Sequence, residues 1–180
     1  AHDAAYRSGN YPPGRTDEEW MRIIQYHFEC VLPVAERHDA TIAIEPHGYL
    51  TTKPEALWRL ATQNGSERIG INFDTGNTFI AGEDPAAFLE LVKDRVVHMH
   101  IKDVSEPLAR ALRGEEMGIA SSEAAVGEGV NTENIRRCID IMAATGREIP
   151  ISPEAGGDRL MASSIRWLRG YVESRGYATR

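Results

Sequence analysis

Four side chains that can bind a metal ion or transfer a proton stand at matching points of four separate aliphatic segments. They are Glu45 in "TIAIEP", Asp74 in "RIGINFD", His100 in "RVVHMHIKD" and Glu154 in "EIPISPE". Each segment is typical of a β-strand, and each ends in or near one of these residues. One carboxylate after a strand is usually a loop residue or a helix cap. Four such residues in register on consecutive strands predict a shared site.

Two glutamates, one aspartate and one histidine form a donor set made mostly of oxygen. Hard divalent ions prefer such a set, so we expect Mn²⁺ first, with Mg²⁺, Co²⁺ or Zn²⁺ as alternatives. Four protein ligands leave two positions of an octahedral ion open for adjacent carbonyl and hydroxyl oxygens of a substrate. The ion would stabilise an enediolate and ease removal of the neighbouring C–H proton. One carboxylate can remove that proton, and a second on the opposite face can return one.

The segments that carry these residues alternate between strand and helix patterns. Residues 1–15 read as a polar loop, and Thr16 and Glu19 form a capping box that opens a helix over 16–38. Four strand–helix units follow over 41–176, with strands at 41–46, 68–74, 95–103 and 148–154, and helices that open near residues 52–54, 84–85, 131–132 and 159. The stretch 104–130 is polar, contains glycine and is expected to be a loop. This alternation predicts parallel βαβ units in a single α/β domain over residues 1–180.

Alternate residues of the four predicted strands separate into two faces. One face is aliphatic and is expected to pack on outer helices. The other is small or polar and ends in the four residues that could do chemistry. In an open doubly wound sheet both faces lie under helices and should be apolar, whereas a barrel needs catalytic groups on its inward face. The pattern favours a (β/α)8 TIM-barrel type fold, of which four strands and five helices are present.

Three further residues lie near the predicted site. His98 and His100 share a face, but His98 is about 6–7 Å deeper along the strand, where we expect a hydrogen-bonded residue behind the site. Lys102 lies on the same face at the mouth, and His47 follows Glu45 by two residues. We predict that Lys102 and His47 contact the substrate.

The ordered motifs "AIEPH", "INFDTGN", "HMHIKD", "GEGVN" and "ISPE" resemble the sugar-phosphate isomerase/epimerase superfamily, the xylose isomerase-like barrels. That superfamily includes D-tagatose 3-epimerase, inosose dehydratase and, more distantly, endonuclease IV. The resemblance implies a divalent ion bound by Glu45, Asp74, His100 and Glu154, with Glu45 and Glu154 also acting as the acid/base pair. Asn77 stands where the epimerases usually have a histidine, and an asparagine there can hydrogen-bond a sugar hydroxyl.

In that superfamily the four ligands lie on strands five to eight, so the resemblance covers the C-terminal half of a barrel. A complete barrel needs about 250 residues, and this sequence has 180. Half a barrel would leave the strands at 41–46 and 148–154 as open edges. A partial sequence is the explanation we favour. The alternatives are pairing with another chain that supplies the N-terminal half-barrel, and self-association into a homo-oligomer.

Composition excludes several classes of partner. The net charge is −7 and the basic residues are scattered, which argues against a nucleic-acid or anionic membrane surface. No apolar run approaches the roughly 18 residues of a membrane span, and we expect a cytoplasmic protein.

These observations favour a metal-dependent isomerase or epimerase that acts on a small carbohydrate or polyol ketone by proton transfer through a metal-bound enediolate. A lyase of the inosose dehydratase type is the nearest alternative, because it starts with the same proton abstraction and then expels a hydroxyl. A non-catalytic half-barrel is the third.

Overall fold

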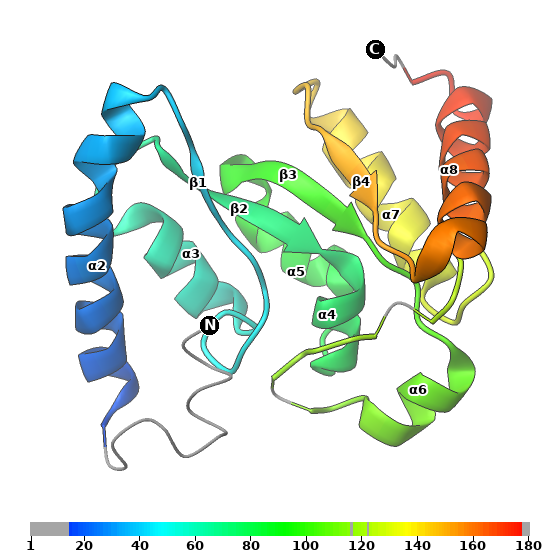
Figure 1. Cartoon of the computed structure of the whole chain (residues 1–180), viewed down its shortest axis with the longest axis horizontal. Helices are drawn as coiled ribbons and strands as arrows, with labels where there is room; N and C mark the ends of the chain where they lie inside the picture. Colours follow the sequence, from blue (N-terminus) through cyan, green and yellow to red (C-terminus); the bar gives the residue numbers. More distant parts are fainter. Residues whose placement is uncertain (1–14, 116, 122, 178–180) are drawn as a thin grey trace.

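The computed structural model describes residues 15–115, 117–121 and 123–177. The loop expected over residues 1–15 therefore lies, apart from Arg15, outside the described residues. Four parallel strands form one sheet in sequence order (Figure 1): β1 (Ile42–Ile44), β2 (Ile69–Asp74), β3 (Val96–Ile101) and β4 (Ile151–Pro153). The α/β class and the four parallel strands are confirmed. β1 and β4 are shorter than expected, so Glu45 and Glu154 follow their strands directly.

Helices occur at all five expected places and at two others. In the described residues they are α2 (Asp17–Arg37), α3 (Pro54–Thr62), α4 (Thr75–Ile80), α5 (Pro85–Val92), α6 (Glu106–Leu112), α7 (Thr132–Ala144) and α8 (Gly157–Ser174), with a 3₁₀ turn η1 at Lys93–Arg95. The expected capping box is present, because Thr16 and Glu19 exchange hydrogen bonds at the start of α2. No helix in the described ranges is both long and apolar enough to cross a membrane.

The two unexpected helices are short and begin at side-chain caps. Asp74 accepts hydrogen bonds from the first turn of α4, a six-residue helix that the sequence pattern did not separate from a turn. Ser105 caps α6, which lies inside the polar stretch expected to be a loop. That expectation was wrong because a seven-residue helix is too short for a clear apolar period.

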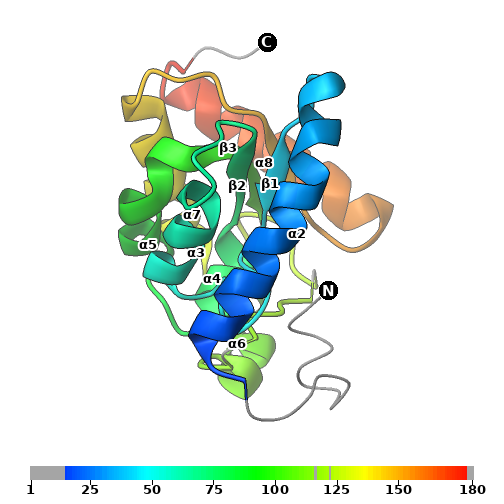
Figure 2. The same cartoon turned by 90° about the vertical axis from the view of Figure 1, so that its left-hand side faces the viewer.

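The two faces of the sheet differ as the alternation predicts. Figures 1 and 2 show α3, α5 and α7 together on one face. The strand residues that point toward these helices, among them Ile71, Phe73, Met99 and Ile101, are fully buried in the main core. Their burial is the main apolar contribution to stability. On the other face Ala43 is exposed, and His98 and His100 are half-buried.

A one-residue irregularity in the β2–β3 pairing sets the position of His100. Ile71 pairs with Val96, but Asn72 pairs with His98, and the ladder continues to Asp74 beside His100. Val97 is therefore an extra residue, as in a β-bulge. Its Cγ1 lies 2.5 Å from where a Cβ on Gly70 would stand, so Val97 leaves the aliphatic face on which alternation places it. Any side chain at position 70 would collide with Val97.

Two arginines connect neighbouring units at the amino-terminal ends of the strands. Arg95 Nη2 donates to the backbone carbonyls of Ala61, Ser66 and Ile69 at 2.9, 2.6 and 2.7 Å. Arg147 donates to the carbonyls of Lys93 and Val96 at 2.8 and 2.7 Å. Arg95 thus connects the segment before β3 to α3 and the start of β2, and Arg147 connects the segment before β4 to η1 and the start of β3.

We predict that Arg95→Met lowers the free energy of unfolding by about 2–3 kcal/mol, because the carbonyls lose a charged donor and stay partly buried. Urea denaturation measures the change. Arg110→Met is the matched control, since Arg110 forms an exposed ion pair with Glu106 on α6 and should contribute less than about 0.5 kcal/mol. Equal losses in the two variants would contradict the role assigned to Arg95.

Candidate metal centre

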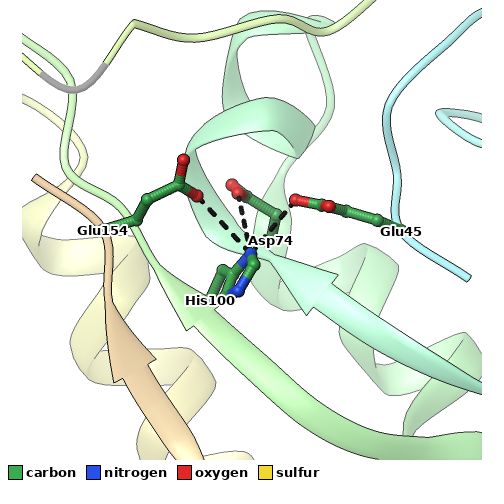
Figure 3. A group of neighbouring side chains, drawn as sticks. All are labelled: Glu45, Asp74, His100 and Glu154. Carbon is green, nitrogen blue, oxygen red and sulfur yellow. Dashed lines mark hydrogen bonds and ion pairs between the residues drawn. The ribbon is translucent and has the colours of Figure 1, made fainter. Parts of the chain in front are cut away.

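Glu45, Asp74, His100 and Glu154 converge at the carboxyl ends of the four strands (Figure 3). One ligand atom from each lies within 4.8 Å of the other three. His100 Nδ1 is 3.2 Å from Glu45 Oε1, 3.4 Å from Glu154 Oε2 and 3.9 Å from Asp74 Oδ2. The structure therefore brings together the four residues that the sequence analysis placed in one site. Each lies at the end of a different strand or directly after it, so the sheet register brings the four residues to one place.

Asp74 is fully buried and uses its two carboxylate oxygens differently. Oδ1 accepts from the backbone N–H groups of Gly76 and Asn77 at 2.8 and 2.7 Å. Oδ2 faces the cluster and accepts no hydrogen bond of suitable geometry from the described residues, although Lys102 Nζ is 3.0 Å away. Burial raises the pKa of Asp74 to about 7, and Lys102 opposes this shift. A buried oxygen without a hydrogen bond is costly, and a cation among the four ligand atoms would satisfy it.

His100 and Glu45 respond to the same crowding. The hydrogen bond with Glu45 raises the pKa of His100 against the effect of burial, and the carboxylates of Asp74 and Glu154 add to the rise. Burial opposes the charge on Glu45, but the contact with His100 outweighs it and lowers the Glu45 pKa. The surrounding carboxylates thus stabilise positive charge beside His100 Nδ1. A divalent cation is such a charge, so the donor set and its electrostatics fit Mn²⁺ or a similar hard ion.

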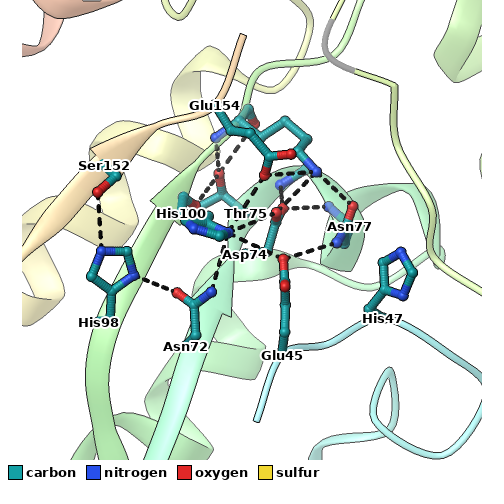
Figure 4. A network of polar contacts seen from close by, with 12 residues as sticks. Glu45, His47, Asn72, Asp74, Thr75, Asn77, His98, His100, Ser152 and Glu154 are labelled. Carbon is teal, nitrogen blue, oxygen red and sulfur yellow. Dashed lines mark hydrogen bonds and ion pairs between the residues drawn. The ribbon is translucent and has the colours of Figure 1, made fainter. Parts of the chain in front are cut away.

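His98 lies behind His100 and contacts it through Asn72 (Figure 4). His98 Nδ1 is 2.7 Å from Asn72 Oδ1, and its Nε2 is 3.0 Å from Ser152 Oγ. Asn72 Nδ2 is 3.1 Å from His100 Nδ1. Burial, together with the neighbouring His100, lowers the pKa of His98, which favours a neutral ring that donates from Nδ1 and accepts from Ser152. Asn72 then presents its N–H to His100 Nδ1, which can accept it when that nitrogen carries no proton, whereas a protonated Nδ1 donates to Glu45.

The three residues expected to contact substrate lie in different surroundings. Asn77 and Lys102 are buried, and their side chains contact protein groups: Asn77 Nδ2 is 3.4 Å from Glu45 Oε1, and Asn77 Oδ1 accepts from Lys102 Nζ at 3.0 Å and from Ala120 N at 3.1 Å. His47 is half-buried, and Figure 4 shows its ring apart from the contacts among the other residues drawn. The structure therefore does not bring His47 into the cluster.

Asp103 is a residue whose importance the sequence analysis did not identify. Its buried carboxylate accepts hydrogen bonds from the backbone of Gly127, Gly129 and Asn131 and from the hydroxyl of Thr132, at 2.7–3.0 Å. The two glycine amides of the "GEG" motif are thus directed to an internal carboxylate. The available signal was an aspartate directly after a strand, together with a glycine pair further along the chain.

The same segment supports the strand ends of the site. Asn131 Nδ2 donates to the carbonyl of Thr75 at 2.9 Å, and lies 3.3 Å from that of Lys102. The Lys102 N–H donates to Thr75 Oγ1 at 3.0 Å. These contacts fix the backbone beyond β3 against the start of α4. Asn72, Thr75 and Asn131 were not predicted as site residues, although alternation had placed Asn72 on the polar face.

Comparison with known proteins gives consistent matches. The family described as xylose isomerase-like TIM barrel matches residues 3–171. An inosose dehydratase from Lacticaseibacillus casei is 32% identical over 100 residues, which are 54% of this chain and 33% of that protein. The rhizopine catabolism protein MocC from Rhizobium meliloti is 30% identical over 132 residues, 73% of this chain and 39% of that protein. The chain thus matches well under half the length of these curated relatives.

Solved structures agree on the fold. A D-tagatose 3-epimerase-like protein superposes with a TM-score of 0.70 at 22% identity, over 91% of this chain and 60% of that one. A xylose isomerase domain protein from Planctomyces limnophilus gives a TM-score of 0.66 at 21% identity, over 91% and 55% of the two chains.

We predict that Mn²⁺ stabilises the protein through the four converging residues. At a hundredfold excess over Kd, binding to the folded state adds about 2.7 kcal/mol, which raises Tm by about 5–10 °C for a chain of this size. Glu154→Gln should remove most of this shift, because it changes one of the four converging residues. Glu154 is half-exposed and its change leaves the α4 cap at Asp74 intact, so the variant should still fold. Glu90→Gln, at an exposed ion pair with Lys93 outside the cluster, is the control. An equal Mn²⁺ shift in both variants would contradict the ligand role of Glu154.

Proposed function

Because the chain belongs to the xylose isomerase-like TIM barrel family, as its motifs predicted, we propose that it forms the metal-binding side of an enzyme that modifies small sugars or polyol ketones. The proposed reaction begins with removal of a proton from the carbon beside a carbonyl. The observation that carries this proposal is the convergence of three carboxylates and one imidazole, each from a different strand, within 4.8 Å.

The proposed metal ligands are Glu45, Asp74, His100 and Glu154. A divalent ion bound there would supply Lewis acidity, which makes a C–H proton beside a polarised carbonyl easier to remove. The residues of this chain would hold that ion and direct the substrate. His47, on the loop after Glu45, is the proposed contact for a substrate oxygen.

Glu45 and Glu154 are the proposed proton carriers. Figure 3 shows their carboxylates on either side of Asp74, so they can face a bound substrate from two sides. The lowered pKa of Glu45 keeps it ionised near neutral pH, as a base requires. If one glutamate removes a proton and the other returns one, the product is an isomer or epimer, and this is the reaction we favour.

A dehydratase is the second candidate. It shares the proton abstraction but then loses a hydroxyl from the next carbon. The observation in its favour is that a relative 32% identical over 100 residues is named an inosose dehydratase. Mn²⁺ is the proposed ion for either reaction.

The sheet order leaves β1 and β4 with one neighbour each among the described strands. We propose that further strands pair with these edges to complete a barrel, either from another part of the same protein or from a second copy. Such strands would supply the rest of the substrate pocket.

We predict that the Mn²⁺-loaded protein catalyses exchange of a substrate C–H proton with D₂O, measured by ¹H NMR on a panel of ketohexoses and keto-inositols. Glu45→Gln and Glu154→Gln should each reduce exchange by about 10²–10⁴-fold, the usual contribution of a general acid or base. Glu90→Gln should leave it unchanged.

The product separates the two candidates. A new epimer or aldose supports the isomerase, whereas loss of water with a new ultraviolet-absorbing dicarbonyl or enone supports the dehydratase. If the Mn²⁺-loaded protein, assayed with the strands that complete the barrel, exchanges no proton of any ketone in the panel, the proposed function is wrong and a non-catalytic role is favoured.

A further inference from the structure

Lys102 is a buried lysine inside the acidic cluster. Its side chain is 4% exposed, and lysine is rarely buried to this extent unless its charge is paired. Its Nζ lies 3.0 Å from Asp74 Oδ2 and 3.0 Å from Glu154 Oε2. It also donates to Asn77 Oδ1 at 3.0 Å. An ammonium group has three N–H bonds, and three oxygens surround this one. All three oxygens belong to protein side chains, so the ammonium is directed at the cluster itself.

The rest of the side chain is fixed as well. The backbone N–H of Lys102 donates to Thr75 Oγ1, and its carbonyl accepts from the same hydroxyl at 3.1 Å. A Cβ on Gly76 would stand 2.7 Å from the Cγ and Cδ atoms of Lys102, so the aliphatic stem lies directly against the glycine backbone. Glycine at position 76 is therefore required for Lys102 to reach the cluster.

Asn77 extends the effect of Lys102 to the opposite side of the site. Its Oδ1 faces two donors, Lys102 Nζ and the Ala120 amide, which directs its Nδ2 toward Glu45 Oε1 at 3.4 Å. A continuous path of polar contacts thus runs from Glu154 through Lys102 and Asn77 to Glu45. Figure 4 shows Glu154, Asn77 and Glu45, the labelled residues of this path, around Asp74.

From these contacts we propose that Lys102 is the internal counter-ion of the acidic cluster. It holds the carboxylates of Asp74 and Glu154 together when no metal ion is bound, and it orients Glu45 through Asn77. Lys102 and Asn77 are thus positioning residues and not contacts for the substrate. The proposal rests on the proposed metal centre in one respect only, namely that the ammonium and a divalent ion stabilise the same carboxylates.

Two consequences follow from charge. Without Lys102, the metal-free cluster keeps its negative charges at short range with less compensation, so the metal-free fold is less stable. A divalent ion then enters a more negative site and meets no ammonium beside it, so it binds more tightly. A lysine that only filled space would produce neither effect, because methionine fills nearly the same space.

The test compares Lys102→Met with Lys93→Met, which removes the same charge from an exposed ion pair with Glu90. In EDTA-treated protein, Tm should fall by at least about 5 °C for Lys102→Met and by less than about 2 °C for Lys93→Met. The increase in Tm on adding Mn²⁺ should be larger for Lys102→Met than for the wild type, and titration calorimetry should show tighter Mn²⁺ binding.

A second pair of variants keeps the test decisive if Lys102→Met folds poorly. Adding Glu154→Gln to Lys102→Met restores the charge balance, so the metal-free double variant should be more stable than Lys102→Met alone. Lys102→Gln keeps a hydrogen-bond donor for Asn77 but lacks the charge, and it should behave as Lys102→Met does.

Three results would overturn the counter-ion role: Lys102→Met as stable as Lys93→Met without metal, weaker Mn²⁺ binding in Lys102→Met than in the wild type, or Lys102→Gln that matches the wild type. Absence of any Mn²⁺ shift in the wild type would instead reject the proposed metal centre. The metal-free comparison would still decide the role of Lys102.

Discussion

Repulsion between like charges is the constraint on which this site depends. Glu45, Asp74 and Glu154 point to one location, and their ligand atoms lie within 4.8 Å of one another and of His100. Folding must supply the free energy that holds these groups together. It does so partly through the burial of the apolar sheet face and partly through positive partners inside the cluster. Burial raises the pKa of Asp74 and the neighbouring carboxylates raise that of His100, so a cation among these groups would be stabilised by the same negative charges.

The parallel sheet solves the geometric part of this problem. Carboxyl ends of neighbouring parallel strands lie at one edge, so one residue per strand suffices to build a site. The irregularity at Val97 is needed as well, since the pairing of Ile71 with Val96 would otherwise place Met99 beside Asp74. Gly70 makes room for that irregularity and Gly76 for the stem of Lys102. Both positions thus require glycine for the same physical reason, because a neighbouring side chain occupies the space that a Cβ would fill.

Sequence reasoning could predict the features that depend on period and on strand ends. Alternation along the strand placed Ile71 and Phe73 on one face and Asn72 and Asp74 on the other. This alternation, read to the end of each strand, located one residue of the site on each. It could not predict α4 and α6, because their caps outweigh an apolar pattern too short to recognise. Nor could it predict the partners of Lys102, since these lie 25 or more residues away and depend on how the side chain passes Gly76. The convergence of Glu45, Asp74, His100 and Glu154 was thus predictable from the sequence, whereas the contacts that hold these residues were not.

Asp103 shows why the support of such a site is hard to read from a sequence. An aspartate after a strand and a glycine-containing loop each suggest an outward role, as a helix cap or an anion cradle. In the structure they satisfy each other, and a Cβ on Gly129 would lie 2.3 Å from Asp103 Oδ1. The carboxylate thereby holds the segment at 127–132, and Asn131 in turn holds the backbone of Thr75 and Lys102. The Asp103 carboxylate on the outer side of β3 therefore helps to fix the position of the Lys102 ammonium on its inner side. The stability of the acidic cluster depends on both residues.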